Sequence, residues 1–450
     1  MIGAGSSGIA ACQVLEARGI QFDCFEKGSG VGGNWRYQND NGMSSAYLSL
    51  HINTSRGLMA YATFPMPDDY PDYPNHFQIA RYFDAYVDHF GFRDRICFRT
   101  EVIAVEPGDG GQWTVTVEDD RGRRERHSYG AVLVANGHHW DPRWPEPPFP
   151  GSDRFEGEQI HAHYYREPEA LEGKRVLVLG IGNSATDIAV ESSRVAEATF
   201  LAMRRGAYVV PKYLGGKPTD EAGAEAITRL PLALQRRFFL RSLKTATGEM
   251  TSYGLPQPDH KLLEAHPTIS SELLPRIGHG DIDVKPNIDR FEGSRVLFAD
   301  GSGEEIDLVV YCTGYKISFP FLAPELVTAE DNRVPLYRRV VSIENPGLYF
   351  IGLIQPLGAI MPIAELQSEW VADLLEGSAV LPATGTMRNV VEREDRRMAK
   401  RYVASKRHTI QVDFYPYMRT LLRERRRGAR RGPLSGLLAR RSHELRVGTA

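Results

Sequence analysis

Apolar residues recur along this chain with spacings that are typical of helices and of buried strands. Over residues 79–90 they stand three or four positions apart, which predicts a helix that ends at Gly91. Residues 175–179 form an almost continuous apolar run, which is typical of a buried strand. The same reasoning predicts helices over 9–18 and 184–192, strands over 102–105 and 113–117, and a hairpin with an Asp-Gly turn over 296–302.

Three segments lack such a pattern. Residues 30–75 are rich in Gly, Asn, Tyr, Asp and Pro, and we expect a long loop region there. Residues 140–151 contain five prolines, which predicts a connector between two larger units. Residues 211–290 are rich in Pro, Gly and His, and we expect a large irregular insertion.

Two glycine-rich turns stand just ahead of predicted helices. The first comprises Gly3, Ala4, Gly5, Ser6, Ser7 and Gly8, and the second comprises Gly180, Ile181, Gly182, Asn183, Ser184 and Ala185. A turn of this kind holds the pyrophosphate of a dinucleotide against backbone N–H groups at the N-terminus of the following helix. One such turn is weak evidence, because it also occurs in unrelated loops. Two of them indicate a protein that binds two nucleotide cofactors.

The residue after the next apolar run indicates which dinucleotide each turn binds. Glu26 stands 23 positions after Gly3, and Arg204 and Arg205 stand 24 and 25 positions after Gly180. An acid at this place accepts hydrogen bonds from ribose hydroxyls, whereas an arginine accommodates a 2′-phosphate. The first unit therefore favours FAD, and the second favours NADPH.

The duplication extends beyond the turns. The apolar run and small-residue ending over 131–137 resemble those over 308–314, and each ends 134 positions after the first glycine of its unit. Only Met1 and Ile2 precede Gly3, whereas such a turn normally follows a strand of about five residues. We therefore expect the native protein to carry a short apolar strand ahead of Ile2.

Composition limits the class of protein. The 450 residues are enough for two domains, and 42% apolar and 25% charged residues are typical of a soluble globular enzyme. No apolar run approaches the about 20 residues that span a bilayer, and no secretory leader precedes Gly3, so we expect a cytoplasmic protein. The four cysteines show no Cys-x-x-Cys spacing and are expected to be buried thiols in a reducing compartment: Cys12, Cys24, Cys97 and Cys312.

Charge is unevenly distributed. The net charge of −3 does not point to a polyanionic partner, and we expect none among nucleic acids. Residues 421–450, however, contain nine Arg and two Glu. This segment is expected to be a solvated basic tail, and peripheral contact with an anionic membrane is the alternative.

A third motif lies between the two turns. Residues 155–165 follow the pattern F-x-G-x-x-x-H-x-x-x-Y, and here the chain resembles the flavin-containing monooxygenases, class B flavoprotein monooxygenases of bacterial type. In that family the fingerprint separates the FAD turn from the NADPH turn. Gly33, Asn34 and Trp35 resemble the family's flavin-contacting turn, and Asn53 and Thr54 lie in a segment similar to its active-site asparagine segment. The resemblance covers nearly the whole chain.

The resemblance implies an α/β fold with two doubly wound Rossmann-like dinucleotide-binding domains, the NADPH domain being inserted into the FAD domain. We expect the FAD-binding domain over 1–168 and 316–420, the NADPH-binding domain over 169–315, and the tail over 421–450. The resemblance also implies NADPH- and O2-dependent oxygenation of a soft sulfur or nitrogen atom in a small organic substrate, through a flavin C4a-hydroperoxide that Asn53 and NADP+ protect. We expect no bound metal, and we expect a homo-oligomer.

Several alternatives stay open. Baeyer–Villiger relatives close the fingerprint with Trp and then Pro or Asp, whereas this chain has Tyr165 and Arg166, which favours heteroatom oxidation over ketone oxygenation. The short first strand leaves a catalytically silent nucleotide-binding protein as a further alternative. Gln367 either faces the flavin, as in the family, or simply lies on a helix. His161 is expected to position the linker between the domains rather than to react.

Overall fold

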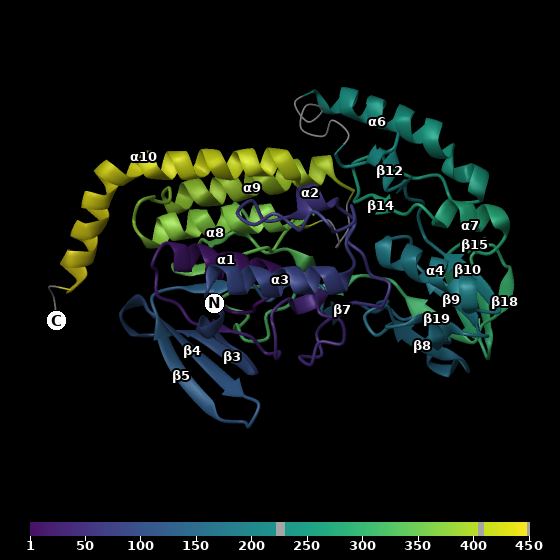
Figure 1. The fold of residues 1–450 in the computed structure, drawn as a ribbon, viewed down its shortest axis with the longest axis horizontal. Coiled ribbons are helices and arrows are strands. Elements are labelled where there is room, and N and C mark those ends of the chain that lie inside the picture. Colours follow the sequence, from purple (N-terminus) through teal and green to yellow (C-terminus); the bar gives the residue numbers. More distant parts are fainter. Residues whose placement is uncertain (222–229, 404–408, 448–450) are drawn as a thin grey trace.

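The computed structural model describes residues 1–221, 230–403 and 409–447, with side chains as far as Arg431. Its elements form two groups that lie side by side (Figure 1). The middle of the chain builds one group around a parallel sheet, and the start and the later part of the chain together build the other.

The middle of the chain forms a five-stranded sheet in which every neighbouring pair is parallel. From edge to edge the strands are β15 (Asp283–Lys285), β10 (Ala198–Ala202), β9 (Arg175–Leu179), β19 (Leu308–Tyr311) and β8 (Glu158–His161). Helices α4 (Asn183–Val195) and α7 (Leu273–His279) bury one face. The meander of β16 (Ile288–Glu292), β17 (Arg295–Phe298) and β18 (Gly303–Glu305) packs on the other. Burial of both faces explains why β9 and β19 consist almost entirely of Val and Leu.

The second sheet combines strands that are distant in sequence. Four of them run in the order β21 (Leu336–Tyr337), β22 (Val341–Ser342), β23 (Leu348–Phe350) and β6 (Val132–Val134), and β1 (Cys24–Phe25) pairs with β2 (Ile96–Cys97). Ile2 lies between these two sets, because it forms parallel bridges to Val134 on one side and to Phe25 on the other. The two residues ahead of Gly3 therefore lie in the middle of the sheet.

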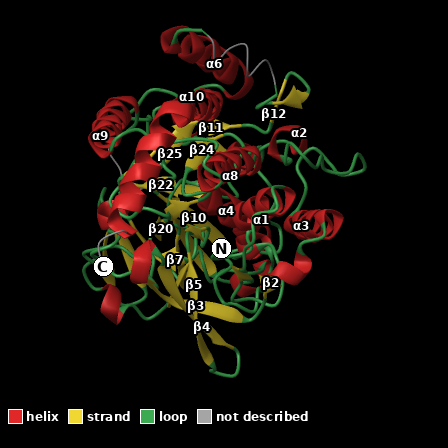
Figure 2. Cartoon of the chain, turned by 90° about the vertical axis from the view of Figure 1, so that its left-hand side faces the viewer, coloured by secondary structure: helices red, strands yellow, loops and turns green. Residues whose placement is uncertain are grey.

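Helices bury the apolar surface of this second group. The core contains residues of α1 (Ser6–Ala17), α3 (His76–Phe90) and α8 (Met361–Leu375). A capping box between Asn75 and Gln78 starts α3 three residues before the predicted helix, and Gly91 in the left-handed region ends it, as the sequence predicts. The meander of β3 (Thr100–Pro107), β4 (Trp113–Asp119) and β5 (Arg124–Tyr129) lies at the opposite end of the molecule from α6 (Leu232–Thr247), as Figure 2 shows.

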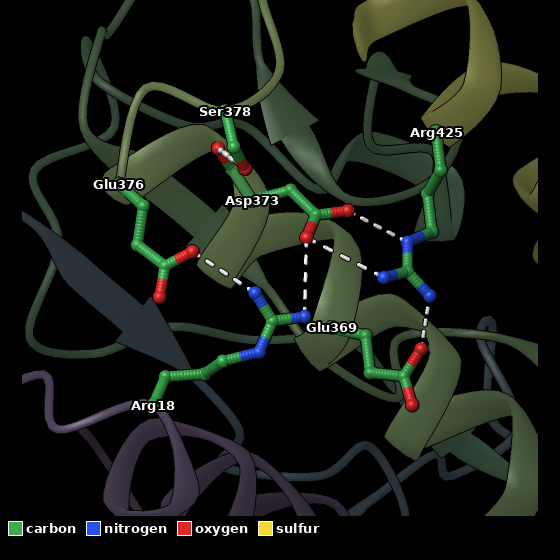
Figure 3. A network of polar contacts seen from close by, with 6 residues as sticks. All are labelled: Arg18, Glu369, Asp373, Glu376, Ser378 and Arg425. Carbon is green, nitrogen blue, oxygen red and sulfur yellow. Dashed lines mark hydrogen bonds and ion pairs between the residues drawn. The ribbon is translucent and has the colours of Figure 1, made fainter.

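The basic C-terminal segment is a helix, α10 (Phe414–Val447), which runs along α8 (Figure 1). Figure 3 shows the ion pairs that fasten it: Arg425 contacts Glu369 and Asp373 of α8, and Asp373 also pairs with Arg18 at the end of α1. The Arg425 Nε to Asp373 Oδ2 distance is 2.7 Å. Leu421 is fully buried. The expectation of an unpacked tail from residue 421 is therefore wrong for Leu421, Glu424 and Arg425, whereas the solvated side of the helix carries the exposed Arg423, Arg426, Arg427 and Arg430.

Two further expectations need correction. In the segment 211–290 the described residues, which leave out 222–229, are not wholly irregular, since they include α6 and α7, and their strand β15 completes the five-stranded sheet. Cys97 is exposed and Cys312 partly exposed, whereas Cys12 and Cys24 are buried as predicted. The remaining long helix is α9 (Thr384–Arg401). The short elements are α2 (Arg56–Met59), β7 (Asp141–Pro142), β11 (Val209–Val210), β12 (Tyr213–Leu214), β13 (Lys217–Pro218), β14 (Thr268–Ile269), β20 (Tyr315–Lys316), β24 (Gln355–Leu357) and β25 (Gln411–Asp413). Within the described part of the chain, no helix combines the length and the apolar character that crossing a membrane requires.

Candidate active site

The two glycine-rich turns share one backbone geometry. Gly3 has a φ of +91° and Gly180 a φ of +137°, which L side chains rarely adopt. A Cβ at Gly3 would lie 2.8 Å from the carbonyl oxygen of Ala135, and a Cβ at Gly180 would lie 2.8 Å from that of Cys312. Ala135 follows β6, and Cys312 follows β19. The duplication in the sequence is therefore also a duplication in structure.

Each turn leads into a helix that begins without a side-chain cap. Gly5 is the N-cap of α1 and Gly182 is the N-cap of α4, and no described side chain accepts a hydrogen bond there. The open N–H groups and the helix dipole suit an anion such as a phosphate. A Cβ at Gly8 would lie 1.9 Å from Gly3 O, and one at Gly33 would lie 3.1 Å from Gly5 Cα, so a side chain does not fit at either of these two positions. The first helical turns contain Ser6, Ser7 and Gly8 in α1, and Asn183, Ser184 and Ala185 in α4.

The predicted adenosine-binding side chains lie at matching strand ends. Glu26 directly follows β1, and Arg204 and Arg205 follow β10. Glu26 is buried, and its carboxylate accepts a hydrogen bond from the N–H of Ala4 at 2.8 Å. Both arginines are exposed, and Arg205 pairs with Asp259 at 3.3 Å between Nε and Oδ2. The first turn thus has a carboxylate beside it, whereas the second has two guanidinium groups.

The turn predicted to contact the flavin is a 3-10 helix, η1 (Gly33–Trp35). It packs against the first glycine turn, because Gly32 N donates to Ala4 O at 3.0 Å. The side-chain oxygen of Asn34 accepts hydrogen bonds from both the N–H and the hydroxyl of Ser45, at 2.8 and 2.9 Å. Asn34 therefore fixes the shape of its own loop.

Asn53 lies on the loop ahead of α2. Its neighbours Ile52 and Thr54 are buried, and Asn53 itself is partly buried. No described residue hydrogen-bonds its side-chain amide, so both the donor and the acceptor of the amide are available to a ligand. The loop is held from its far side, since Ser55 N donates to Asp220 Oδ2 at 2.6 Å.

Gln367 on α8 is fully buried, and both ends of its amide bind inside the protein. It accepts a hydrogen bond from Gly352 N and donates one to the hydroxyl of Tyr417, both at 2.8 Å. Gly352 touches the first turn, because a Cβ there would lie 1.9 Å from Ser7 Oγ. Gln367 thus supports the first turn through Gly352, and this geometry does not favour its predicted direct contact with the flavin. Sequence reasoning missed Gly352, since a single glycine in an apolar run gives no local signal of a distant contact.

A cluster of three titratable residues beside the second turn, Tyr47, Asp187 and Lys212, was also missed. Asp187 on α4 accepts a hydrogen bond from the hydroxyl of Tyr47, and burial raises the pKa of this carboxyl to about 6. The charge of Lys212 opposes this rise, and burial lowers the pKa of the Lys212 ammonium group. Tyr47 comes from the segment 30–75, so its hydrogen bond to Asp187 joins the two groups of elements. No local pattern links these three residues.

His161 fits its expected structural role. Its Nδ1 accepts the N–H of His163 at 3.0 Å, and its ring packs between Trp144 and Tyr315. Burial lowers the pKa of His161 to about 4, which keeps the imidazole neutral at physiological pH.

Comparison with known proteins identifies the family. A model described as flavin-binding monooxygenase-like matches residues 1–427. This chain belongs to that family. Flavin-containing monooxygenase 5 of Rattus norvegicus is 39% identical over 433 residues, which are 93% of this chain and 80% of the relative. Dimethylaniline monooxygenase [N-oxide-forming] 2 of Mus musculus is 35% identical over 439 residues, which are 94% of this chain and 82% of the relative.

A solved structure agrees. The S-allyl-L-cysteine S-oxygenase from Allium sativum superimposes with a TM-score of 0.71 at 26% identity, covering 98% of this chain and 93% of that one. The predicted α/β fold with two Rossmann-type domains is thereby confirmed. The protein is a flavin-dependent monooxygenase that uses FAD and NADPH, as the sequence predicts. The alternative of a catalytically silent nucleotide-binding protein finds no support in these comparisons.

Proposed function

We propose that this monooxygenase transfers one oxygen atom from O2 to a soft sulfur or nitrogen atom of a small organic molecule. The observation that carries the proposal is its likeness, over more than nine-tenths of the chain, to proteins whose names specify N-oxide formation and S-oxygenation. The fingerprint agrees, because Tyr165 and Arg166 stand where ketone-oxygenating relatives have Trp and then Pro or Asp.

The two cofactors are assigned to the two turns by the residues beside them. We assign FAD to the turn of Gly3–Gly8 with Glu26, where backbone N–H groups take the pyrophosphate and the carboxylate takes ribose hydroxyls. NADPH is assigned to the turn of Gly180–Ala185, where the exposed Arg204 and Arg205 take the 2′-phosphate. Bound FAD supplies the hydride acceptance and the O2 activation that side chains lack.

Asn53 is the residue that we assign to the reacting atoms. Its amide both donates and accepts a hydrogen bond and does not titrate, so it can orient a polar group without exchanging a proton with it. It carries no hydrogen bond to a described residue, and its neighbours Ile52 and Thr54 are buried, which holds the loop in place. A partly buried, preorganised amide of this kind favours oxygen transfer over loss of reduced oxygen to water.

Substrate oxygenation tests the proposal. The enzyme is supplied with NADPH and with an alkyl aryl sulfide, a tertiary amine or a cyclic ketone, and products are identified by mass. We expect a sulfoxide or an N-oxide, whereas exclusive formation of a lactone would overturn the assignment to heteroatoms. Asn53→Ala should retain FAD but release most of the reducing equivalents as hydrogen peroxide. Asn389→Ala, which removes an exposed asparagine of α9, is the matched control and should behave as the parent.

A further inference from the structure

Part of the chain between β10 and β15 contacts the Asn53 loop in the other group of elements. This part comprises residues 212–221, with the hairpin of β12 and β13, and we call it the strap. At its start, Lys212 O accepts a hydrogen bond from the hydroxyl of Tyr73 at 2.6 Å. The Lys212 ammonium lies 4.9 Å from the centre of the Tyr73 ring and donates to Ile52 O at 3.5 Å. The beginning of the strap therefore touches the residue immediately before Asn53.

The end of the strap touches the other side of the same loop. Asp220 Oδ2 accepts a hydrogen bond from Ser55 N at 2.6 Å. The next residue, Glu221, packs against Gly57, where a Cβ would lie 3.2 Å from Glu221 Oε1. The loop that carries Asn53 is thus held at residue 52 from one side and at residue 55 from the other.

The bond from Ser55 to Asp220 is the most directed of these contacts. Ser55 is fully buried, and Asp220 Oδ1 is also shielded from solvent. Asp220 Oδ1 has no hydrogen-bond partner among the described residues. Ser55 is therefore the main residue that fixes this carboxylate. Ser55 itself is held by the carboxylate at its N–H and by Leu58 N and Met59 N at its carbonyl oxygen, at 3.1 and 2.9 Å. Hydrogen bonds to a charged group are stronger and more directional than neutral ones.

We propose that Asp220 is a positioning residue, which sets the orientation of the Asn53 amide by holding Ser55 two residues away. The inference rests on the proposed role of Asn53, and it adds a physical link between the two nucleotide-binding halves. Asp220 stands on the chain segment that follows the second turn and β10, whereas Asn53 stands on the segment that follows the first turn. The half assigned to NADPH thereby determines the geometry of the loop assigned to oxygen transfer.

The test compares three variants for coupling and for local protection. Asp220→Ala removes the acceptor, Asp220→Asn keeps an amide oxygen that still accepts the Ser55 N–H, and Tyr213→Phe removes a different bond of the same strap. That control bond joins the exposed Tyr213 hydroxyl to Asp72 Oδ2 at 2.9 Å. Each FAD-loaded variant is assayed for hydrogen peroxide released per NADPH oxidised, for the KM of NADPH, and for hydrogen–deuterium exchange at the Ser55 amide.

In Asp220→Ala we expect peroxide release per NADPH and Ser55 exchange each to rise about tenfold, with FAD content and the KM of NADPH unchanged. Asp220→Asn and Tyr213→Phe should stay near the parent. Parent-like coupling in Asp220→Ala would overturn the proposal, and so would parent-like exchange at Ser55. If Asp220→Ala fails to retain FAD, the test rests on Asp220→Asn. This variant keeps an oxygen that accepts the Ser55 N–H, so strong uncoupling in it would show that the hydrogen bond is not what couples the reaction and would overturn the proposal. Exchange at Ser55 needs no substrate, so a parent that oxygenates nothing refutes the proposed function without deciding the role of Asp220.

Discussion

Adding one methyl group at Gly8 tests whether the first glycine-rich turn holds the FAD pyrophosphate. Gly8 lies in the first turn of α1, in ordinary helical conformation, so helix propensity alone predicts that Gly8→Ala stabilises the helix by about 1 kcal/mol. The obstacle is a contact with distant backbone. The new Cβ would lie 1.9 Å from Gly3 O, whereas Cβ atoms essentially never come within 3.0 Å of such an atom.

The magnitude follows from that overlap. The start of α1 must move by at least about 1.1 Å relative to Gly3, and overpacking of this kind costs about 3 kcal/mol. After the gain in propensity, a net loss of about 2 kcal/mol in the free energy of unfolding remains. The shift also displaces the N–H groups to which we assign the pyrophosphate. Loss of one hydrogen bond to a charged group, about 1.5–3 kcal/mol, weakens FAD binding about 10-fold to 150-fold.

The assay measures FAD retained after gel filtration, the Kd of FAD by flavin fluorescence, and the Tm of the apoprotein. Gly385→Ala is the matched control, because Gly385 lies in the first turn of α9 and a Cβ there meets nothing within 4 Å. We expect Gly385→Ala to keep FAD affinity and to raise the Tm slightly. If Gly8→Ala binds FAD as tightly as Gly385→Ala does, the first turn does not hold the pyrophosphate in the way we propose.

Two further predictions concern the second turn. Arg204→Ala combined with Arg205→Ala should reduce the kcat/KM preference for NADPH over NADH about tenfold or more, since a charge-assisted hydrogen bond contributes about 1.5–3 kcal/mol. Equal efficiency of the parent with both nucleotides would refute this prediction. Because the double variant also frees Asp259 from its ion pair with Arg205, Asp259→Asn is the control. Burial raises the pKa of Asp187 to about 6, whereas the pKa of an aspartate in the unfolded chain is about 3.9. The contribution of this carboxyl to the free energy of unfolding is therefore fully present below pH ~4 and is lost as the pH rises through 6. Asp187→Asn, which still accepts the Tyr47 hydroxyl, should therefore raise the Tm more at pH 8 than at pH 4.5, and an equal change at both pH values would contradict the raised pKa.

The sequence predicted those features that are encoded locally. A continuous apolar run identified β9, and the glycine spacing identified both turns, because each of these depends on a few consecutive residues. The helix α6 was missed for a physical reason. Leu243 is its only buried residue, and large apolar residues such as Leu234 and Phe238 are exposed, so its apolar positions do not mark a single buried face. Its flanks are rich in Pro and Gly, which favoured the interpretation of an irregular insertion.

The residues that support the site could not be predicted because their contacts join distant segments. Gly352 touches Ser7 across about 345 positions, and Asp220 reaches Ser55 across 165. Neither belongs to a spaced motif, and each contact pairs a side-chain atom with backbone, since Gly352 N donates to Gln367 and the Asp220 carboxylate accepts from Ser55 N. By contrast, Gln367 resembled a family position, yet its amide is used inside the protein. A motif identifies which residue type stands near a site, but the tertiary contacts decide whether its polar atoms are free.

The two turns also explain how one backbone design serves two nucleotides. A Cβ at Gly3 or at Gly180 would lie 2.8 Å from the carbonyl oxygen of the residue that follows β6 or β19, so the backbone of the cradle does not distinguish FAD from NADPH. The distinction rests on the side chain after the next strand, and the two units treat that side chain differently. Glu26 is buried and bonded to the N–H of Ala4 in its own turn, so its charge is part of the cradle and cannot be replaced without leaving a buried donor unpaired. Arg204 is exposed, so its replacement costs little stability. Substitutions at Arg204 can therefore change the nicotinamide nucleotide preference at little cost in stability. A substitution at Glu26, by contrast, would also destabilise the first turn.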